Sequence, residues 1–286
     1  MSSYPYTLPA RVSTSTTFLK SNTMPPNQKR IQLLQAEVDE NDQSFVRLLV
    51  DGHQIKYLTI EPGTYEAEDM CFGPALASVL PPLPSGNWND GLVAWDAKDS
   101  QPHFVYTTRT AFRGVKNTWH GTRVDCLEIE TGEKLRTGIY KAKVPNLDAV
   151  VVAKFARFDW EIGYIENETT AYEWINGHDI GPRFLGHLTE DGRVIGFLME
   201  YIVDARHAGP GDLEACREVL SRLHELGIRH GDTNRFNFLV RGSEATLVDF
   251  DTARRCSDGD VLLAELASLS ECLQDSSMRG GRGYFA

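Results

Sequence analysis

Apolar and polar residues alternate in two short segments near residue 50. The segments are FVRLLV (45–50) and HQIKYLTI (53–60), and they flank the dipeptide Asp51-Gly52. A period of two is typical of half-buried strands, and Asp-Gly accepts the positive φ angles of a tight primed turn. The pattern therefore predicts a β-hairpin over residues 45–60.

Two other N-terminal segments lack such a pattern. Residues 1–30 are rich in Ser, Thr and Pro, which predicts a disordered arm, and they contain no apolar run that could serve as a signal peptide. Residues 72–92 carry clusters of Pro, Gly and Asn and are interpreted as an irregular connection. Residues 31–103 are therefore predicted to be an N-terminal extension that contains the hairpin.

Strand-like segments become frequent from about residue 104. Five such segments together predict a small antiparallel sheet. The turn signal Asp191-Gly192 separates the last two of them. The segments are VDCLEI (124–129), RTGIYKAKV (136–144), AVVVAKFA (149–156), FLGHLTE (184–190) and VIGFLMEY (194–201).

Helical spacing follows in three places. Residues 160–175 place Ile165, Tyr172 and Ile175 along one stripe, and residues 212–226 form a second apolar seam that Gly227 is placed to end. Two strand-like segments, NFLVRG and ATLVDF, separate this helix from a closing one. The closing helix is marked by Leu262, Leu266, Leu269 and Leu273.

Composition narrows the class of protein. The 286 residues include 40 acidic and 29 basic side chains, for a net charge of −11, which argues against a dedicated nucleic-acid partner. No apolar stretch is long enough to span a bilayer, and the five cysteines form no close pair of the metal-binding or redox type. These features fit a cytoplasmic or nuclear protein, and of the two compartments we predict the cytoplasm. We expect no contact with a membrane.

The segments HGDTNRFN (230–237) and LVDFD (247–251) contain the candidate catalytic residues. They resemble the protein-kinase-like superfamily, whose catalytic loop has the form His-x-Asp-x-x-x-x-Asn and whose metal-binding Asp follows on a later strand. The Gly after the His and the Asp-Phe-Asp ending are more similar to small-molecule kinases of the aminoglycoside and choline type, and to atypical kinases, than to ordinary protein kinases.

This resemblance implies an α+β, two-lobed protein-kinase-like fold. A five-stranded antiparallel N-lobe sheet would occupy residues 104–202, and a reduced helical C-lobe residues 203–286. The implied cofactors are ATP and Mg²⁺. Asp232 would accept the proton of the acceptor hydroxyl, while Asn237 and Asp249 would hold Mg²⁺. His230 is expected to brace the loop through a hydrogen bond.

Upstream, Val151-Val152-Ala153-Lys154 resembles the family's Val-Ala-x-Lys strand. A lysine that emerges from an apolar strand needs a partner, and Glu168 lies inside the buried stripe of the next helix. The resemblance implies that Lys154, paired with Glu168, binds the α- and β-phosphates. The alternative is a solvent-exposed lysine on an edge strand and an ordinary charge on the helix surface.

Residues 198–202 (LMEYI) resemble the family's hinge. By that resemblance Met199 would guard the rear of an adenine pocket, and the Glu200 carbonyl and Ile202 amide would pair with adenine. A buried strand with no ligand is an equally good interpretation of the pattern.

Two parts of the family pattern are absent or altered. No Gly-x-Gly-x-x-Gly loop precedes Lys154, and Thr131-Gly132-Glu133 and Gly138 are the nearest candidates. Only 37 residues follow Asp249, and no Ala-Pro-Glu segment appears among them. A small-molecule acceptor, or an unconventional protein target, is therefore the better expectation for the substrate.

The resulting hypothesis is an ATP- and Mg²⁺-dependent phosphotransferase that acts on a hydroxyl group. One alternative is a pseudokinase, a nucleotide-binding scaffold without turnover. Another is a kinase-like scaffold turned to a different ATP-dependent transfer in a biosynthetic pathway, such as adenylylation or amide formation. No sequence feature indicates an oligomeric state.

Overall fold

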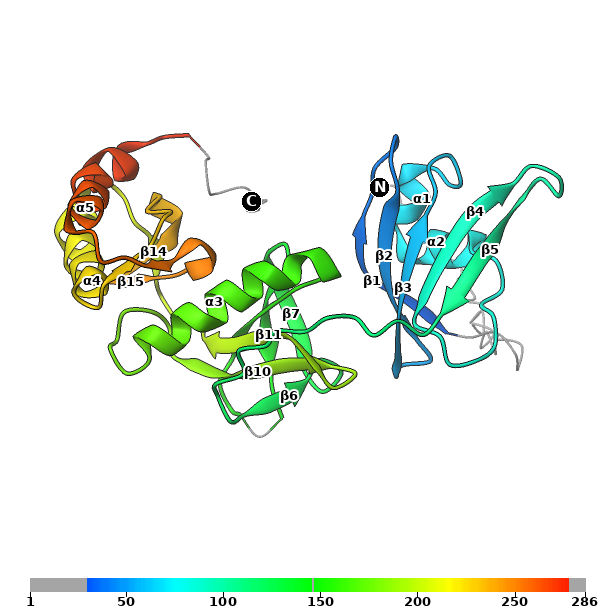
Figure 1. Cartoon of the computed structure of the whole chain (residues 1–286), viewed down its shortest axis with the longest axis horizontal. Coiled ribbons are helices and arrows are strands. Elements are labelled where there is room, and N and C mark those ends of the chain that lie inside the picture. Colours follow the sequence, from blue (N-terminus) through cyan, green and yellow to red (C-terminus); the bar gives the residue numbers. More distant parts are fainter. Residues whose placement is uncertain (1–29, 146, 278–286) are drawn as a thin grey trace, which may run out of the picture.

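The computed structural model describes residues 30–145 and 147–277. The predicted disordered arm therefore lies, apart from residue 30, outside the described residues. The chain forms an α+β structure with one sheet near the N-terminus, a second sheet in the middle with helix α3 beside it, and two further helices toward the C-terminus (Figure 1). None of the described helices is long and apolar enough to cross a membrane.

The N-terminal sheet has five strands in the order β1-β2-β3-β4-β5, and only β3 and β4 run parallel. The predicted hairpin is confirmed, with Asp51 (φ 53°) and Gly52 (φ 77°) in its turn. A separate apolar core, centred on Val46, Leu58 and Trp88, fills this part. The strands are β1 (Ile31–Glu37), β2 (Ser44–Val50), β3 (Gln54–Ile60), β4 (Asp90–Asp96) and β5 (Gln101–Thr108).

Two predictions for this region were wrong. Residues 72–92 are not irregular throughout: helix α2 (Gly73–Val79) follows α1 (Ala67–Cys71), because Pro74 suits a first helical turn and Leu76 is fully buried. The expected boundary after residue 103 also falls inside β5, which pairs with β4 as far as Thr108. The Pro, Gly and Asn residues of this segment indicated turns, and nothing in the local pattern indicated that Leu76 would be buried.

The second sheet corrects the prediction of five antiparallel strands. It has six, in the order β6-β10-β11-β9-β8-β7, and β6 runs parallel to β10. The missed strand is β7, whose sequence ETGEKLR is too polar to give an alternating signal. The strands are β6 (Arg123–Asp125), β7 (Glu130–Arg136), β8 (Ile139–Lys143), β9 (Val151–Phe155), β10 (Phe184–Glu190) and β11 (Arg193–Glu200).

Helix α3 (Ile162–Ile175) packs against β11 and is preceded by the single turn η1 (Asp159–Glu161). Ile165, Tyr172 and Ile175 are all buried, so the predicted apolar stripe is confirmed. Glu168 lies in the same stripe and is fully buried. A buried carboxylate in an apolar helix face requires a cation close by.

The C-terminal part joins α4 (Leu213–Glu225) and α5 (Gly259–Gln274) to a small antiparallel hairpin, β14 (Phe238–Arg241) and β15 (Glu244–Leu247). Gly227, at φ 65°, follows α4 as predicted. The remaining short elements are β12 (Arg206–His207), η2 (Pro210–Asp212), β13 (Ile228–Arg229), η3 (Arg235–Asn237), η4 (Phe250–Thr252) and β16 (Arg254–Arg255).

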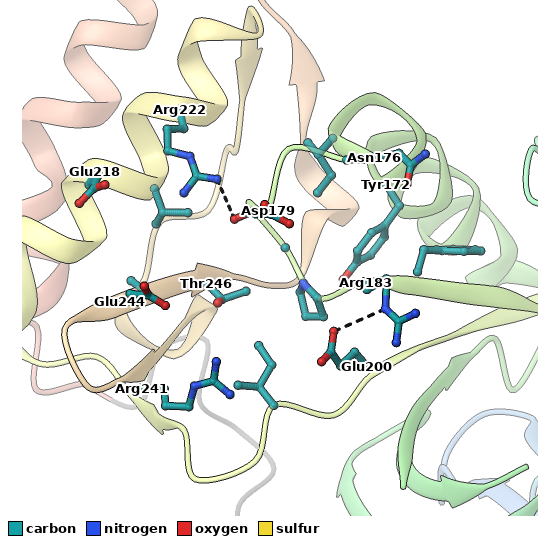
Figure 2. Close-up of a pocket in the computed structure, with 18 of the residues that line it drawn as sticks. Tyr172, Asn176, Asp179, Arg183, Glu200, Glu218, Arg222, Arg241, Glu244 and Thr246 are labelled. Atoms are coloured by element: carbon teal, nitrogen blue, oxygen red, sulfur yellow. Dashed lines mark hydrogen bonds and ion pairs between the residues drawn. The ribbon is translucent and has the colours of Figure 1, made fainter. Parts of the chain in front are cut away.

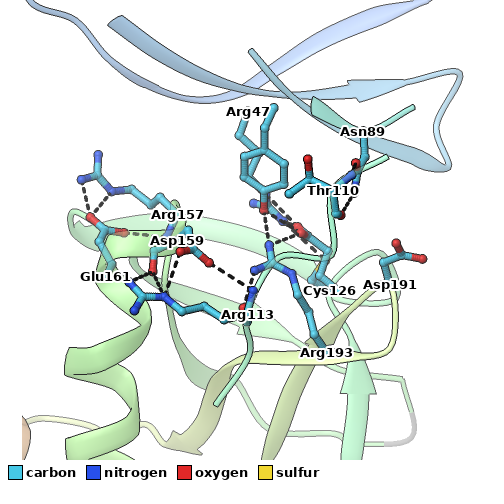
Figure 3. Close-up of polar contacts among 12 residues, drawn as sticks. Arg47, Asn89, Thr110, Arg113, Cys126, Arg157, Asp159, Glu161, Asp191 and Arg193 are labelled. Atoms are coloured by element: carbon cyan, nitrogen blue, oxygen red, sulfur yellow. Dashed lines mark hydrogen bonds and ion pairs between the residues drawn. The ribbon is translucent and has the colours of Figure 1, made fainter. Parts of the chain in front are cut away.

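A buried polar network joins the two large sheets (Figure 3). Glu190, at the end of β10, pairs with Arg47 of β2 and with Arg193 of β11. The distance from Arg193 Nη2 to Glu190 Oε1 is 2.7 Å. Tyr57 of β3 donates its hydroxyl to the same carboxylate at 2.6 Å. Burial would raise the pKa of Glu190, but the two guanidinium groups lower it below its ordinary value. The network attaches the N-terminal sheet to the β10–β11 hairpin.

We expect the variant Glu190→Gln to lower the free energy of unfolding by about 3–5 kcal/mol, because it leaves buried guanidinium groups without a carboxylate. Urea unfolding of the whole chain measures this change. The matched control is Asp191→Asn in the neighbouring pair with Arg109, whose side chains are 59% and 46% exposed. That substitution should cost less than about 1 kcal/mol. Equal effects of the two variants would contradict a structural role for the buried network.

Candidate active site

Lys154 is the centre of the candidate site. It lies on β9, between β8 and β11, and its Nζ is 2.5 Å from Glu168 Oε2 on α3. The ion pair expected from the sequence is therefore present. Lys154 Nζ also lies 2.5 Å from Asp249 Oδ1, a contact that the sequence analysis did not anticipate. One ammonium group thus links three segments that are far apart in the chain.

Burial and charge set the protonation of this group. Burial raises the pKa of Glu168 to about 7, and the ammonium of Lys154 offsets only part of that rise. Burial would also raise the pKa of Asp249, but Lys154 and then Arg136 lower it below its ordinary value. Burial disfavours the charged form of Lys154, yet its two carboxylate neighbours raise its pKa above the ordinary value. Lys154 and Asp249 are therefore charged at neutral pH.

Asp249 has a special backbone conformation. It follows β15 and has φ 67° and ψ 63°, in the left-handed region that most residues other than glycine avoid. This conformation begins η4 and coincides with the point at which the carboxylate meets Lys154. Aspartate adopts this region more readily than most residues, so the turn can form at a position that also needs a carboxylate.

Asp232 and Asn237 lie together on the loop that leads to β14. The Asn237 amide donates to the Asp232 backbone carbonyl at 2.9 Å and to its Oδ2 at 3.1 Å. Asn234 donates to the same Oδ2 at 2.9 Å. The loop is joined to the strand that precedes Asp249, because the Val248 amide donates to the Asn237 carbonyl at 3.0 Å. Two amides thus orient the Asp232 carboxylate.

Helix α5 supports this loop through Glu265. Its carboxylate accepts the backbone N–H groups of His230 at 3.0 Å and Gly231 at 2.6 Å, and it contacts His224 at 2.8 Å. His230 is buried, and its ring bonds to the Val248 carbonyl at 3.2 Å and to the Asp232 amide at 3.3 Å. His230 therefore braces the loop as expected. Glu265 escaped the sequence analysis, because an acidic residue between leucines of an amphipathic helix normally faces solvent.

A cavity of about 320 Å³ joins Lys154 to the predicted hinge segment, residues 198–202, of which 199–202 line it. Met199 is buried at one wall, where its sulfur accepts the Tyr172 hydroxyl at 3.1 Å. Lys141 of β8 lies 4.6 Å from the ring centroid of Tyr201, so the β7–β8 hairpin contacts the hinge segment. Six of the eight predicted site residues line this cavity: Lys154, Glu168, Met199, Glu200, Ile202 and Asp249. Asp232 and Asn237 adjoin it through Val248.

Two larger cavities are also present, and the first adjoins the smaller one. One of about 660 Å³ borders α3, α4 and the β14–β15 hairpin and also touches Glu200 and Ile202 (Figure 2). In it Arg222 donates to the Asp179 carbonyl at 2.9 Å, and Arg183 lies 3.9 Å from Glu200. The other, of about 650 Å³, lies between the two large sheets. Neither contains Lys154 or Asp249, so the smaller cavity is the better candidate for chemistry.

The residues predicted to bind Mg²⁺ suit a hard cation. Asn237 is buried, and within the described ranges its Oδ1 has no hydrogen-bond partner, while Asp249 supplies a carboxylate. Amide and carboxylate oxygens are the ligands that Mg²⁺ prefers. Among residues 30–145 and 147–277 no group of three or more His, Cys, Asp and Glu side chains could hold a metal ion. Any site for Mg²⁺ would therefore depend on water or a bound phosphate for its other ligands.

Comparison with known proteins gives a partial similarity. No protein-family model matches the chain. Over 101 residues it is 29% identical to a "probable bifunctional tRNA threonylcarbamoyladenosine biosynthesis protein" of Methanoculleus marisnigri. The match covers 33% of this chain and 18% of that protein, so this chain spans less than a fifth of its relative's length. A segment of this chain is thus similar to part of a protein named for biosynthesis.

The loop-bracing carboxylate of Glu265 predicts a specific pH dependence. Burial would raise its pKa, but the bonds from His224, Gly231 and His230 lower it below the ordinary value. A lowered folded-state pKa stabilises the fold above the ordinary glutamate pKa, and the stabilisation is lost as the pH falls through the folded-state value. Compared with Glu265→Gln, we expect the wild type to be more stable by about 2 kcal/mol at about pH 7, with the difference shrinking toward pH 3.

Chemical unfolding of both proteins across this pH range measures the difference. The matched control is Glu271→Gln, which changes an exposed glutamate on the same helix and should give a small difference at every pH. A difference between wild type and Glu265→Gln that does not change with pH would show that the charge of Glu265 is not the source of the stabilisation.

Proposed function

We propose that this protein is an ATP- and Mg²⁺-dependent phosphotransferase whose catalytic unit, the part of the chain that follows β5, is protein-kinase-like. The observation that carries the proposal is the placement of Lys154 between Glu168 and Asp249, at the wall of a cavity and beside the Asp232–Asn237 loop. Phosphoryl transfer depends on positioning and charge neutralisation, and these residues supply a cation, two oxygen ligands for a metal and a base.

Each side chain has a role in this proposal. Lys154, held by Glu168, binds phosphate oxygens of the nucleotide, and the hinge segment binds the adenine ring beside Met199. Asn237 and Asp249 hold Mg²⁺, which neutralises charge on the phosphates when it is bound. Asp232 accepts the proton of the acceptor hydroxyl. Its carboxylate is oriented for this by the Asn234 and Asn237 amides on Oδ2.

The acceptor is proposed to be a hydroxyl group of a small molecule or of an unconventional protein target. Among the residues described after Asp249 there is one helix of more than a single turn, α5, and its Glu265 braces the catalytic loop. The face of α5 that carries Glu265 is therefore occupied by the loop. Because the protein of similar sequence is named for biosynthesis, another ATP-dependent transfer is the second candidate.

Transfer from γ-labelled ATP with Mg²⁺ tests the proposal, with and without candidate hydroxyl acceptors. We expect Asp249→Asn to lower turnover about a thousandfold, which corresponds to about 4 kcal/mol of transition-state stabilisation. Asp232→Asn should lower turnover by about a hundredfold or more, with nucleotide affinity kept. Asp191→Asn, on an exposed turn, is the matched control and should retain full turnover. Unchanged turnover in Asp232→Asn would refute the assignment of the base.

The nucleotide product separates the candidate reactions. Phosphotransfer predicts ADP and a phosphorylated acceptor, whereas adenylylation predicts pyrophosphate and an acceptor that carries the AMP group. Chromatography of the reaction mixture resolves these products. A nucleotide-binding scaffold predicts a thermal shift with Mg·ATP and no product at all. Formation of pyrophosphate instead of ADP by purified wild type, abolished in Asp249→Asn, would favour the second candidate over phosphotransfer.

A further inference from the structure

The β7–β8 hairpin replaces the missing glycine-rich loop with a short turn. Arg136 pairs with Ile139, so only Thr137 and Gly138 form the connection between the two strands. Gly138 has φ 73°, and a Cβ atom added there would lie 2.8 Å from the Phe155 carbonyl oxygen. The Phe155 amide donates to the Gly138 carbonyl at 2.9 Å. The turn is therefore held against β9, directly beside Lys154.

This arrangement leaves few backbone N–H groups to bind phosphates. A glycine-rich loop binds phosphate oxygens through several backbone N–H groups in succession, which a two-residue turn held against a strand cannot provide. The β7–β8 pairing has irregular register between Thr131 and Arg136, but it remains a paired hairpin. Phosphate binding at this position must therefore come from a side chain.

Arg136 is the side chain in the right place. It ends β7, lines the cavity and is 17% exposed, and its Nη1 lies 3.8 Å from Asp249 Oδ2. Lys154 contacts the other oxygen, Oδ1, of the same carboxylate. Two cations therefore flank Asp249, one from β9 and one from the β7–β8 hairpin. The guanidinium group therefore lies at the wall of the cavity, beside the carboxylate of Asp249.

We propose that Arg136 binds the terminal phosphates of the nucleotide in place of backbone N–H groups. This inference rests on the proposed function, because it presumes that the cavity takes a nucleotide. A guanidinium group can donate two parallel hydrogen bonds to one phosphate and keeps its charge at any physiological pH. Lys154, which Glu168 and Asp249 hold in place, contacts phosphates closer to the ribose.

The test is nucleotide affinity, which does not depend on turnover. Titration calorimetry with Mg²⁺ compares ATP, ADP and adenosine for wild type, Arg136→Ala and Arg136→Lys. We expect Arg136→Ala to bind ATP at least tenfold more weakly, with a smaller loss for ADP and adenosine affinity within about twofold. Arg136→Lys should recover part of the ATP affinity, because it keeps the charge but not the paired donors.

Arg241→Ala is the matched control, since Arg241 is exposed on the β14–β15 hairpin and does not line this cavity. It should bind all three ligands as the wild type does. If Arg136→Ala kept the wild-type preference for ATP over adenosine, or weakened adenosine equally, Arg136 would have a structural role only and the inference would be wrong. If the wild type bound no nucleotide, the proposed function itself would fail.

Discussion

The ammonium of Lys154, held between two carboxylates, is the interaction on which the rest of the structure depends. Glu168 comes from α3 and Asp249 from the turn after β15, so one buried cation joins the second sheet to the C-terminal part. Each carboxylate would be costly to bury without the ammonium of Lys154, and that ammonium would be costly to bury without the carboxylates. The three side chains lie at the wall of a cavity. Apolar side chains at the same positions would stabilise the fold without the cost of burying charges.

Local periodicity predicted much of the fold. The hairpin of β2 and β3, the strands β10 and β11, and the buried stripe of α3 were recognised because their apolar residues repeat at the period of the element. The polar strand β7 was missed, since its pairing with β8 supplies backbone hydrogen bonds that no side-chain pattern reports. The parallel pairing of β6 with β10 depends on contacts between residues about 64 positions apart, as for Arg123 and His187.

The motifs named most residues of the candidate site, but the contacts between them could be predicted only where both partners lie within one local pattern. Glu168 was assigned to Lys154 because the helix stripe that buries it could be read from the sequence. The second partner of Lys154, Asp249, could not be paired in advance, because its contact depends on a left-handed turn 95 residues away. Glu265 and Arg136 were missed for the same reason. The role of an acidic residue in a helix, or of a basic one in a polar strand, depends on the groups that the fold places next to it.

The N-terminal extension and the candidate site share a single strand. β11 begins at Arg193, which contacts Glu190 and Tyr57 in the network between the two large sheets, and it ends at Met199 and Glu200 on the wall of the cavity. β11 pairs with β10 from Arg193 to Met199 and with β9 from Gly196 to Glu200, so both ends belong to one continuous sheet. The buried charges that attach the N-terminal sheet therefore also help to define the geometry of the hinge segment.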